Sequence, residues 1–132
     1  MRLKKYWHSI RLLLCGEGYA RAEYIRKHNL FGAMGKDCYF HPFLMPGDPK
    51  SIFIHDNVKI ASNVTFINHD IANAMLNKKN NTDEYQYYCE PIEIFDNVLI
   101  GTNTTILPGR KIGPNSVVGG VLLLLEMSKK VQ

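Results

Sequence analysis

The stretch Ile94–Val118, IFDNVLIGTNTTILPGRKIGPNSVV, carries an aliphatic residue at every sixth position. These residues are Ile94, Ile100, Ile106, Ile112 and Val118. A period of six matches neither an α-helix nor a simple strand, whose side chains repeat every 3.6 and 2 residues. It predicts that six residues form one short strand and one corner. Three such sides close a triangular coil, and successive coils stack about 4.8 Å apart, so we expect an all-β solenoid.

The same pattern occurs earlier in the chain. Residues 54–66, IHDNVKIASNVTF, match residues 94–106, IFDNVLIGTNTTI, at seven of thirteen positions with an offset of forty. Internal repetition at this level indicates equivalent turns of one solenoid. The pairs Asp56-Asn57 and Asp96-Asn97 would fill equivalent corners, because Asn and Asp tolerate left-handed backbone angles and hydrogen-bond their own turn.

Two interruptions divide the repeats. The pattern begins weakly at Met34, and the fourteen residues from Phe40 to Ile54 are not a multiple of six, which predicts a small loop. The segment 71–90 is polar and rich in Asn, and a solenoid side cannot accommodate it, so we expect a long protruding loop that is a candidate for function. The expected organisation is an N-terminal helical, basic segment 1–30, repeats over 31–120 and an atypical tail 121–132.

Composition excludes several classes of protein. The 132 residues suffice for one domain with its own core. The net charge of +4 comes from residues 1–30, where seven Lys/Arg face two Glu, and no basic stripe interleaved with aromatic residues supports nucleic-acid binding. Three cysteines without metal-like spacing favour a reducing compartment, so we expect a cytoplasmic protein.

The N-terminal segment predicts an amphipathic helix. Leu3, Tyr6 or Trp7, Ile10 and Leu13 or Leu14 recur at three-to-four spacing and form one apolar stripe. We expect this helix to pack over one open end of the solenoid, where strand edges would otherwise be unpaired. The alternative is a basic amphipathic helix that rests on an anionic membrane surface.

The repeats, together with VLIG at 98–101, LPGRKIG at 107–113 and FINHD at 66–70 before a long loop, resemble the hexapeptide-repeat acyltransferases. Within that family the chain resembles the sugar and polysaccharide O-acetyltransferases of the maltose and galactoside type. The resemblance implies a left-handed parallel β-helix that transfers an acetyl group from acetyl-CoA to a hydroxyl of a sugar or cell-surface saccharide. It also implies a homotrimer, with CoA in the groove between neighbouring coils.

The resemblance assigns roles to individual residues. His69 would be the general base, because an imidazole with a pKa near 6.5 can accept a hydroxyl proton at neutral pH. Asn68 and Asp70 would orient its ring or hold the acceptor. The other candidates are Gly101, Thr102, Gly119 and Gly120 for acetyl-CoA, the last two glycines suiting tight corners equally well, and Tyr85, Tyr87 and Glu90 for the saccharide acceptor.

One segment departs from the family pattern. After Gly120 the chain reads VLLLLEMSKKVQ, and Leu125 and Glu126 stand where relatives carry a threonine and a lysine beside CoA. This tail could be a short capping helix or the sign of a truncated gene, and it keeps a non-catalytic β-helix scaffold as the alternative function. A zinc site would need three histidines from adjacent coils. His41, His55 and His69 do not keep that register, so no metal is expected.

Overall fold

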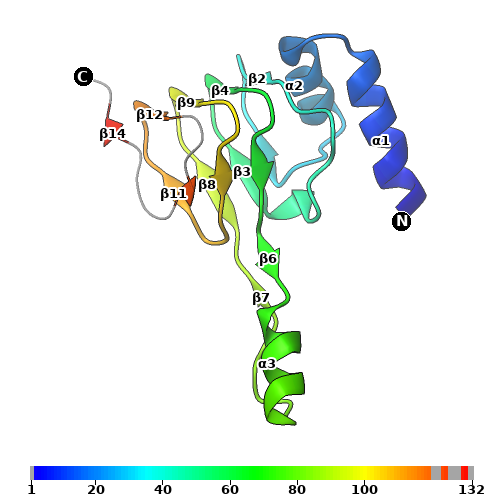
Figure 1. The fold of residues 1–132 in the computed structure, drawn as a ribbon. Helices are drawn as coiled ribbons and strands as arrows, with labels where there is room; N and C mark the ends of the chain where they lie inside the picture. The colour runs from blue at the N-terminus through cyan, green and yellow to red at the C-terminus, as the bar shows by residue number, and fades with distance from the viewer. Residues whose placement is uncertain (1, 120–122, 125–128, 131–132) are drawn as a thin grey trace.

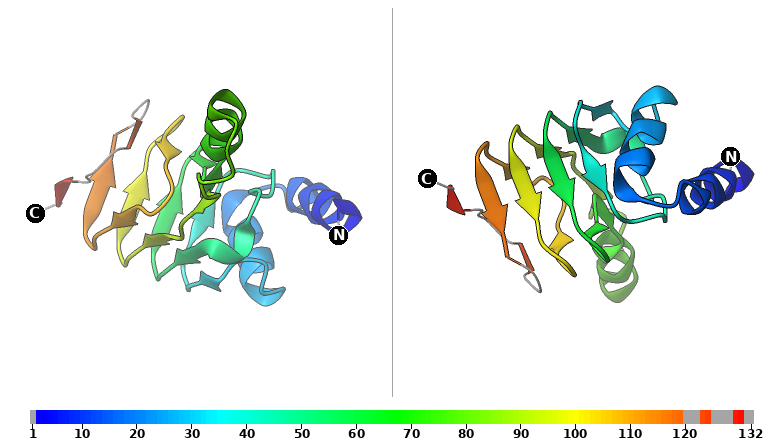
Figure 2. Two further views of the ribbon diagram at one scale, coloured as in Figure 1. Left: turned by 90° about the horizontal axis from the view of Figure 1, so that it is seen from below. Right: turned by 90° about the horizontal axis from the view of Figure 1, so that it is seen from above.

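The computed structural model describes residues 2–119, 123–124 and 129–130, with only the backbone for Arg2 and the last two pairs. The chain passes repeatedly through three parallel sheets (Figure 1). The first sheet holds β1 (Ala33–Met34), β3 (Ile52–Ile54), β8 (Ile92–Ile94) and β11 (Lys111–Ile112). The second holds β2 (Tyr39–Phe40), β4 (Val58–Ile60), β9 (Val98–Ile100) and β12 (Ser116–Val118), and the third holds β5 (Thr65–Phe66), β10 (Thr105–Ile106) and β13 (Leu123–Leu124). Figure 2 shows these strands stacked side by side.

The strand register confirms the sequence repeat. Ile54 pairs with Ile94, and Ile94 pairs with Ile112. The first offset is the forty residues of the internal repeat, and the second is 112 − 94 = 18, which is three hexads. The aliphatic residues point inward and are almost fully buried, and Ile60 and Ile100 have no exposed surface. Burial of one such side chain is worth about 1.5–3 kcal/mol, so these ladders form the core.

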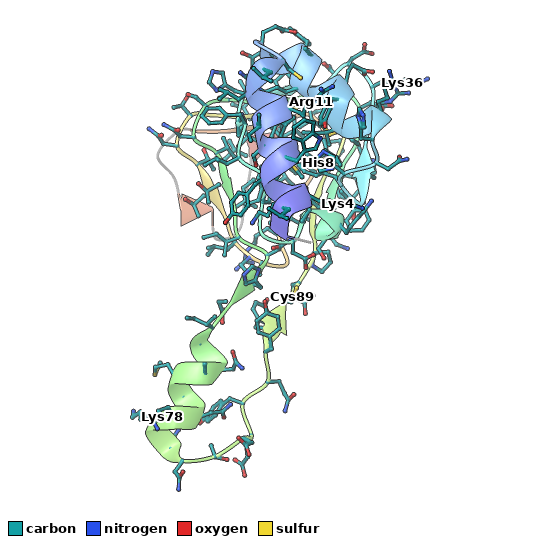
Figure 3. All side chains as sticks on the ribbon, turned by 90° about the vertical axis from the view of Figure 1, so that its right-hand side faces the viewer. Lys4, His8, Arg11, Lys36, Lys78 and Cys89 are labelled. Atoms are coloured by element: carbon teal, nitrogen blue, oxygen red, sulfur yellow. The ribbon has the colours of Figure 1, made fainter. Side chains whose placement is uncertain are left out.

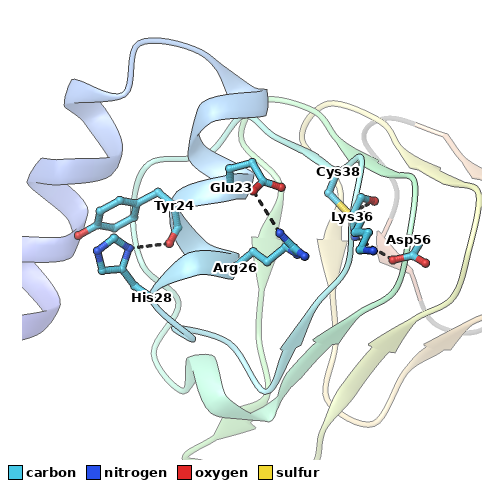
Figure 4. Close-up of polar contacts among 7 residues, drawn as sticks. All are labelled: Glu23, Tyr24, Arg26, His28, Lys36, Cys38 and Asp56. Carbon is cyan, nitrogen blue, oxygen red and sulfur yellow. Dashed lines mark hydrogen bonds and ion pairs between the residues drawn. The ribbon is translucent and has the colours of Figure 1, made fainter.

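Asparagines occupy the corners, as the sequence predicted. Asn57, Asn97 and Asn115 adopt φ values of 54°, 60° and 58° and lie one above another. Asn57 Nδ2 donates to Asn97 Oδ1 at 3.0 Å, and Asn97 Nδ2 donates to Asn115 Oδ1 at 3.1 Å. Left-handed angles cost most residues roughly 1–2 kcal/mol but suit asparagine. An aspartate ladder runs beside them, and Figure 4 shows the Lys36 amide donating to Asp56 Oδ1.

Helix α2 (Gly18–Lys27) covers the first coil and lies against β2. Its N-cap is Glu17, whose carboxylate accepts from the amides of Tyr19 and Ala20. Its buried Arg21 donates to the carbonyls of Leu12 and His41 at 3.0 and 2.9 Å. The expected cover over the open end of the stack is therefore present, and α2 supplies it.

The expectation that the apolar stripe of the first helix packs over the coil is wrong. Helix α1 (Arg2–Leu14) lies beyond α2, at the edge of the molecule (Figures 1 and 2). The stripe faces outward, and Leu3 is 84% and Leu14 is 74% exposed. Helix α1 contacts the body instead through the fully buried Leu12, because α2 already occupies the end of the coil.

Two excursions leave the coil. Residues 41–51 form the small predicted loop and end in the 3₁₀ helix η1 (Pro49–Ser51). The protruding segment contains regular secondary structure, unlike the polar loop that we expected. It forms an arm in which β6 (His69–Asp70) pairs antiparallel with β7 (Tyr88–Cys89). The helix α3 (Ala72–Asn80) forms the tip of this arm (Figure 1). The helix α3 has no buried residue, which explains why its sequence lacks an apolar stripe.

The described part of the tail does not form the capping helix considered from the sequence. Leu123–Leu124 continues the third sheet parallel to β10, and β14 (Lys129–Lys130) pairs antiparallel with β12. Gly120, Leu125 and Glu126 lie outside the described residues. Within the described ranges, no helix is long and apolar enough to cross a membrane.

Candidate active site

The arm joins the coil at a narrow neck, and the candidate base His69 lies there. Strand β5 ends at Phe66, and the chain then turns outward through β6. In the neck His69 pairs with Cys89 and Asp70 pairs with Tyr88. Figure 3 shows this neck, with Cys89 labelled, between the coil and the arm that carries Lys78. The structure therefore places His69 at the junction of coil and arm, as the sequence predicted.

The imidazole of His69 is half-buried between the two excursions. A Cβ atom at Gly47 would lie 2.9 Å from His69 Cε1, so the 41–51 loop passes directly against the ring. The ring centroid of Tyr87 lies 5.9 Å away on the arm, with an interplanar angle of 32°. Desolvation, with smaller contributions from Cys89, Asp48 and Asp70, raises the pKa of the Tyr87 phenol. Tyr87 therefore remains a neutral hydrogen-bonding group at physiological pH.

The side chain of Asn68 lies against the Nδ1 side of the His69 ring. Its side chain is 1% exposed, and its Nδ2 donates to the carbonyl of Asp48 at 2.6 Å. That bond orients the amide so that Oδ1, which can only accept, lies 3.4 Å from His69 Nδ1. In a neutral imidazole, this acceptor favours the proton on Nδ1 and leaves the lone pair on Nε2. A general base needs that arrangement, so Asn68 is a candidate positioning residue.

The other residues predicted for this site divide into two groups. Asp70 Oδ1 accepts from the Ala72 amide at 2.9 Å, so this carboxylate supports the first turn of α3. Tyr85 is held at the tip of the arm, where its amide and carbonyl bind the side chain of Asn77. Glu90 stays at the neck, with its amide donating to the Asn68 carbonyl at 2.9 Å. Tyr87 and Glu90 thus lie near His69 at the neck, whereas Tyr85 lies at the tip of the arm.

Two residues at the neck were not foreseen. Asp48 comes from the 41–51 loop, and its Oδ2 accepts a hydrogen bond from the exposed Cys89 thiol at 3.3 Å. This hydrogen bond is the main reason why the pKa of Cys89 is raised, so the thiol stays protonated. The interruption of the hexads after Phe40 indicated a loop, but no sequence signal indicated that it would meet the second excursion.

The predicted acetyl-CoA residues gather at the corner between the second and third sheets. Gly101 follows β9, and its amide donates to the Val118 carbonyl at 2.9 Å. Thr104 Oγ1 donates to the carbonyls of Gly101 and Gly119, which places these two glycines in neighbouring coils. Thr102 is exposed beside them, and its Oγ1 accepts from Ser62 at 3.4 Å. The corner thus presents small residues, and both backbone polar groups of Gly101 have partners within the coils.

The histidines considered for zinc have other partners. His55 Nε2 is hydrogen-bonded to Glu93 Oε2 at 2.8 Å beside the first sheet, and its ring centroid lies 4.7 Å from that of Phe95. The carbonyl of His41 accepts from Arg21. Within residues 2–119 no group of three or more His, Cys, Asp or Glu side chains is arranged to hold a metal ion.

Known proteins share both the sequence pattern and the fold. The galactoside O-acetyltransferase of Escherichia coli K12 is 38% identical over 88 residues, which are 65% of this chain and 40% of that protein. A solved maltose O-acetyltransferase from Clostridium difficile 630 has a TM-score of 0.59 and 22% identity, covering 97% of this chain and 79% of that one. A galactoside acetyltransferase solved with coenzyme A has a TM-score of 0.53 and 23% identity, covering 90% and 69%.

The chain is thus similar in sequence to curated acetyltransferases over part of their length, and it shares the fold of solved acetyltransferases. The similar proteins include O-acetyltransferases named for galactosides and maltose. No family model matches the chain. The chain spans less than half the length of the curated relatives that it matches.

Proposed function

We propose that this protein is a left-handed parallel β-helix that transfers an acetyl group from acetyl-CoA to a hydroxyl of a sugar or cell-surface saccharide, with His69 as general base. The observation that carries the proposal is the position of His69, half-buried at the neck between Gly47 and Tyr87, with its Nδ1 held by Asn68. The relatives named for O-acetyl transfer support the reaction class, and the structure solved with coenzyme A supports the donor.

The chemistry follows from the tautomer of His69. Nε2 accepts the proton of the acceptor hydroxyl while the oxygen attacks the thioester carbonyl of acetyl-CoA. The imidazolium then returns the proton to the sulfur of the departing CoA, so the protein ends in its starting state. General-base assistance of this kind contributes roughly 10²- to 10⁴-fold. Correct placement of donor and acceptor supplies most of the remaining acceleration.

The two substrates would approach the neck from different elements. Gly101, Thr102 and Gly119 form the corner at which the backbone can contact the pantetheine arm, and Gly120 is proposed to continue this contact region. The acceptor would lie against Tyr87, whose ring offers an apolar face to a sugar. Glu90 and Tyr85 are the further acceptor candidates. A homotrimer in the cytoplasm, with acetyl-CoA between neighbouring coils, completes the proposal.

The test is acetyl transfer by the purified protein, followed as thiol release from acetyl-CoA over a panel of galactosides, maltose and oligosaccharides. His69→Ala should lower kcat by about 10²-fold or more. His55→Ala is the matched control, because this histidine is also half-buried but pairs with Glu93 on the first sheet, and it should keep the wild-type rate. Equal activity of both variants would refute the role of His69.

Calorimetry with acetyl-CoA separates the enzyme from a non-catalytic scaffold. Binding in the micromolar range by the wild-type protein, together with a trimer mass in solution, would support the proposal. If the wild type does not bind but the Leu125→Thr/Glu126→Lys variant does, the chain is a lapsed enzyme on an intact scaffold. If neither binds, the scaffold function replaces the proposed one.

A further inference from the structure

The outward face of α1 is a continuous apolar surface. Successive residues of a helix are turned by about 100°, so the large apolar residues of α1 other than Leu12 fall within an arc of about 120°. All of them are more than half exposed, and they are Leu3, Tyr6, Trp7, Ile10, Leu13 and Leu14. We call this arc the α1 face. Exposed apolar surface on this scale marks an interaction site.

The opposite side of the helix fixes this orientation. His8 Nδ1 lies 2.9 Å from the Tyr24 hydroxyl, and Ser9 Oγ accepts from the Met45 amide at 3.2 Å. Leu12 is fully buried, and its carbonyl accepts from Arg21. A rotation that turned the α1 face inward would break each of these contacts. The face is therefore presented to the outside by specific polar bonds.

The charge around the α1 face is positive only. The sequence of α1, RLKKYWHSIRLLL, contains four Arg or Lys residues and no acidic residue. Figure 3 shows Lys4, His8 and Arg11 along this helix. Behind α1 a hollow of about 680 Å³ opens toward the 41–51 loop, and Lys4, Lys5 and Lys50 line it together with His8 and His28. Desolvation, then the charges of His28 and Lys4, lower the pKa of His8, in keeping with this positive field.

We propose that α1 binds the surface of an anionic lipid bilayer, with the α1 face buried at the boundary of headgroups and acyl chains and the basic residues beside that face, Lys4 and Arg11, on the headgroups. Trp and Tyr side chains suit this boundary because they are apolar with one polar atom. The helix lies in the interface, since thirteen residues extend about 20 Å and a bilayer core needs about 30 Å. No helix among the described residues meets the requirement for spanning.

The charge of α1 favours an anionic bilayer, and not a second copy of the chain, as the partner of the α1 face. A two-fold pairing of two α1 faces would bring eight Lys and Arg side chains together with no acidic residue of α1 between them. A protein partner would have to combine an apolar groove with an acidic rim. An anionic bilayer provides both components, and amphipathic helices with basic polar faces bind there by apolar burial plus electrostatic attraction.

Trp7 provides the direct measurement, because it is the only tryptophan of the chain and lies on the α1 face. We expect its emission to shift to shorter wavelength when the full chain is mixed with vesicles of phosphatidylcholine and phosphatidylglycerol. Co-sedimentation with these vesicles should exceed that with pure phosphatidylcholine by about tenfold or more. The difference should shrink at 0.5 M salt, because salt screens the attraction between basic side chains and anionic headgroups.

Variants test the two components separately. Leu3→Ser/Leu14→Ser removes apolar area, and Lys4→Gln/Arg11→Gln removes charge beside the α1 face. Each should weaken partitioning by about tenfold without lowering Tm, because these side chains are exposed. Ile71→Ser is the matched control. This N-cap of α3 is 73% exposed on the arm, away from α1 (Figure 1), and should bind like the wild type.

Three outcomes would overturn the inference. Absence of vesicle binding does so directly, and equal binding to neutral and anionic vesicles removes the electrostatic part. An oligomer that dissociates in Leu3→Ser/Leu14→Ser, without vesicle binding by the wild type, assigns the α1 face to contact between copies of the chain. None of these measurements uses acetyl transfer, so their failure is distinct from failure of the proposed enzyme activity.

Discussion

The contact between Gly47 and His69 makes the substitution Gly47→Ala a sharp test of the proposed base. The added Cβ would lie 2.9 Å from His69 Cε1 and 3.8 Å from both ring nitrogens. Carbon atoms in contact prefer about 3.5–4.0 Å, so the ring must move by roughly 0.6–1 Å. A misplacement of about 1 Å can cost 10²-fold in rate. We therefore expect kcat to fall by one to two orders of magnitude.

Stability should change little, because the displaced atom is the end of a side chain and Gly47 needs no left-handed backbone. Thiol release from acetyl-CoA gives kcat, a thermal melt gives Tm, and the NMR shifts of the His69 ring protons report its displacement without any activity. Gly113→Ala is the matched control, since its Cβ would meet no atom within 4 Å. A Gly47→Ala protein with shifted ring protons and unchanged kcat would refute our placement of the base.

Three further substitutions address the scaffold. Asn97→Ala should lower the free energy of unfolding by about 1–2 kcal/mol, because residue 97 has a φ of 60°. Asn97→Gly should recover part of this loss in urea unfolding. Equal losses in both variants would mean that the side-chain ladder, and not the backbone angle, stabilises the corner. Burial raises the pKa of the Cys38 thiol, so the folded state retains a proton that the unfolded state releases. The free energy of unfolding should therefore fall as pH rises above about 9, and Cys38→Ala should flatten that slope; an unchanged slope would contradict this. Arg21→Met removes two charged hydrogen bonds to carbonyls and should cost about 2–3 kcal/mol, whereas Arg26→Met, which loses one exposed ion pair, should be nearly neutral in the same measurement.

Sequence periodicity predicted the coil well because its register depends on local chemistry. The forty-residue offset fixed the pairing of Ile54 with Ile94, and the asparagines marked the corners. The side of the first helix that faces the coil could not be predicted in this way. A three-to-four spacing defines an apolar stripe, but it does not say what the stripe contacts, and the decisive contacts of Ser9 and Leu12 come from residues outside that stripe.

Only the site residues that are close to His69 in the sequence could be predicted. His69 and the residues beside it follow from the FINHD motif and the start of the second excursion. Gly47 and Asp48 were missed because they belong to another excursion, and only the stacking of coils brings the two excursions to one neck. The helix α3 was missed because a helix without buried residues needs no apolar stripe.

The offsets between paired strands also show how a segment can be inserted into the chain between two coils. Between neighbouring coils the offset is 18 residues at Ile94–Ile112 and forty at Ile54–Ile94, and the difference, 40 − 18 = 22, is the extra length of the arm. Strands on both sides of the insertion nevertheless remain in register, because each coil recognises only its neighbours. A corner can thus gain or lose a protruding element without any adjustment of the core, so a new arm can arise on an unchanged framework.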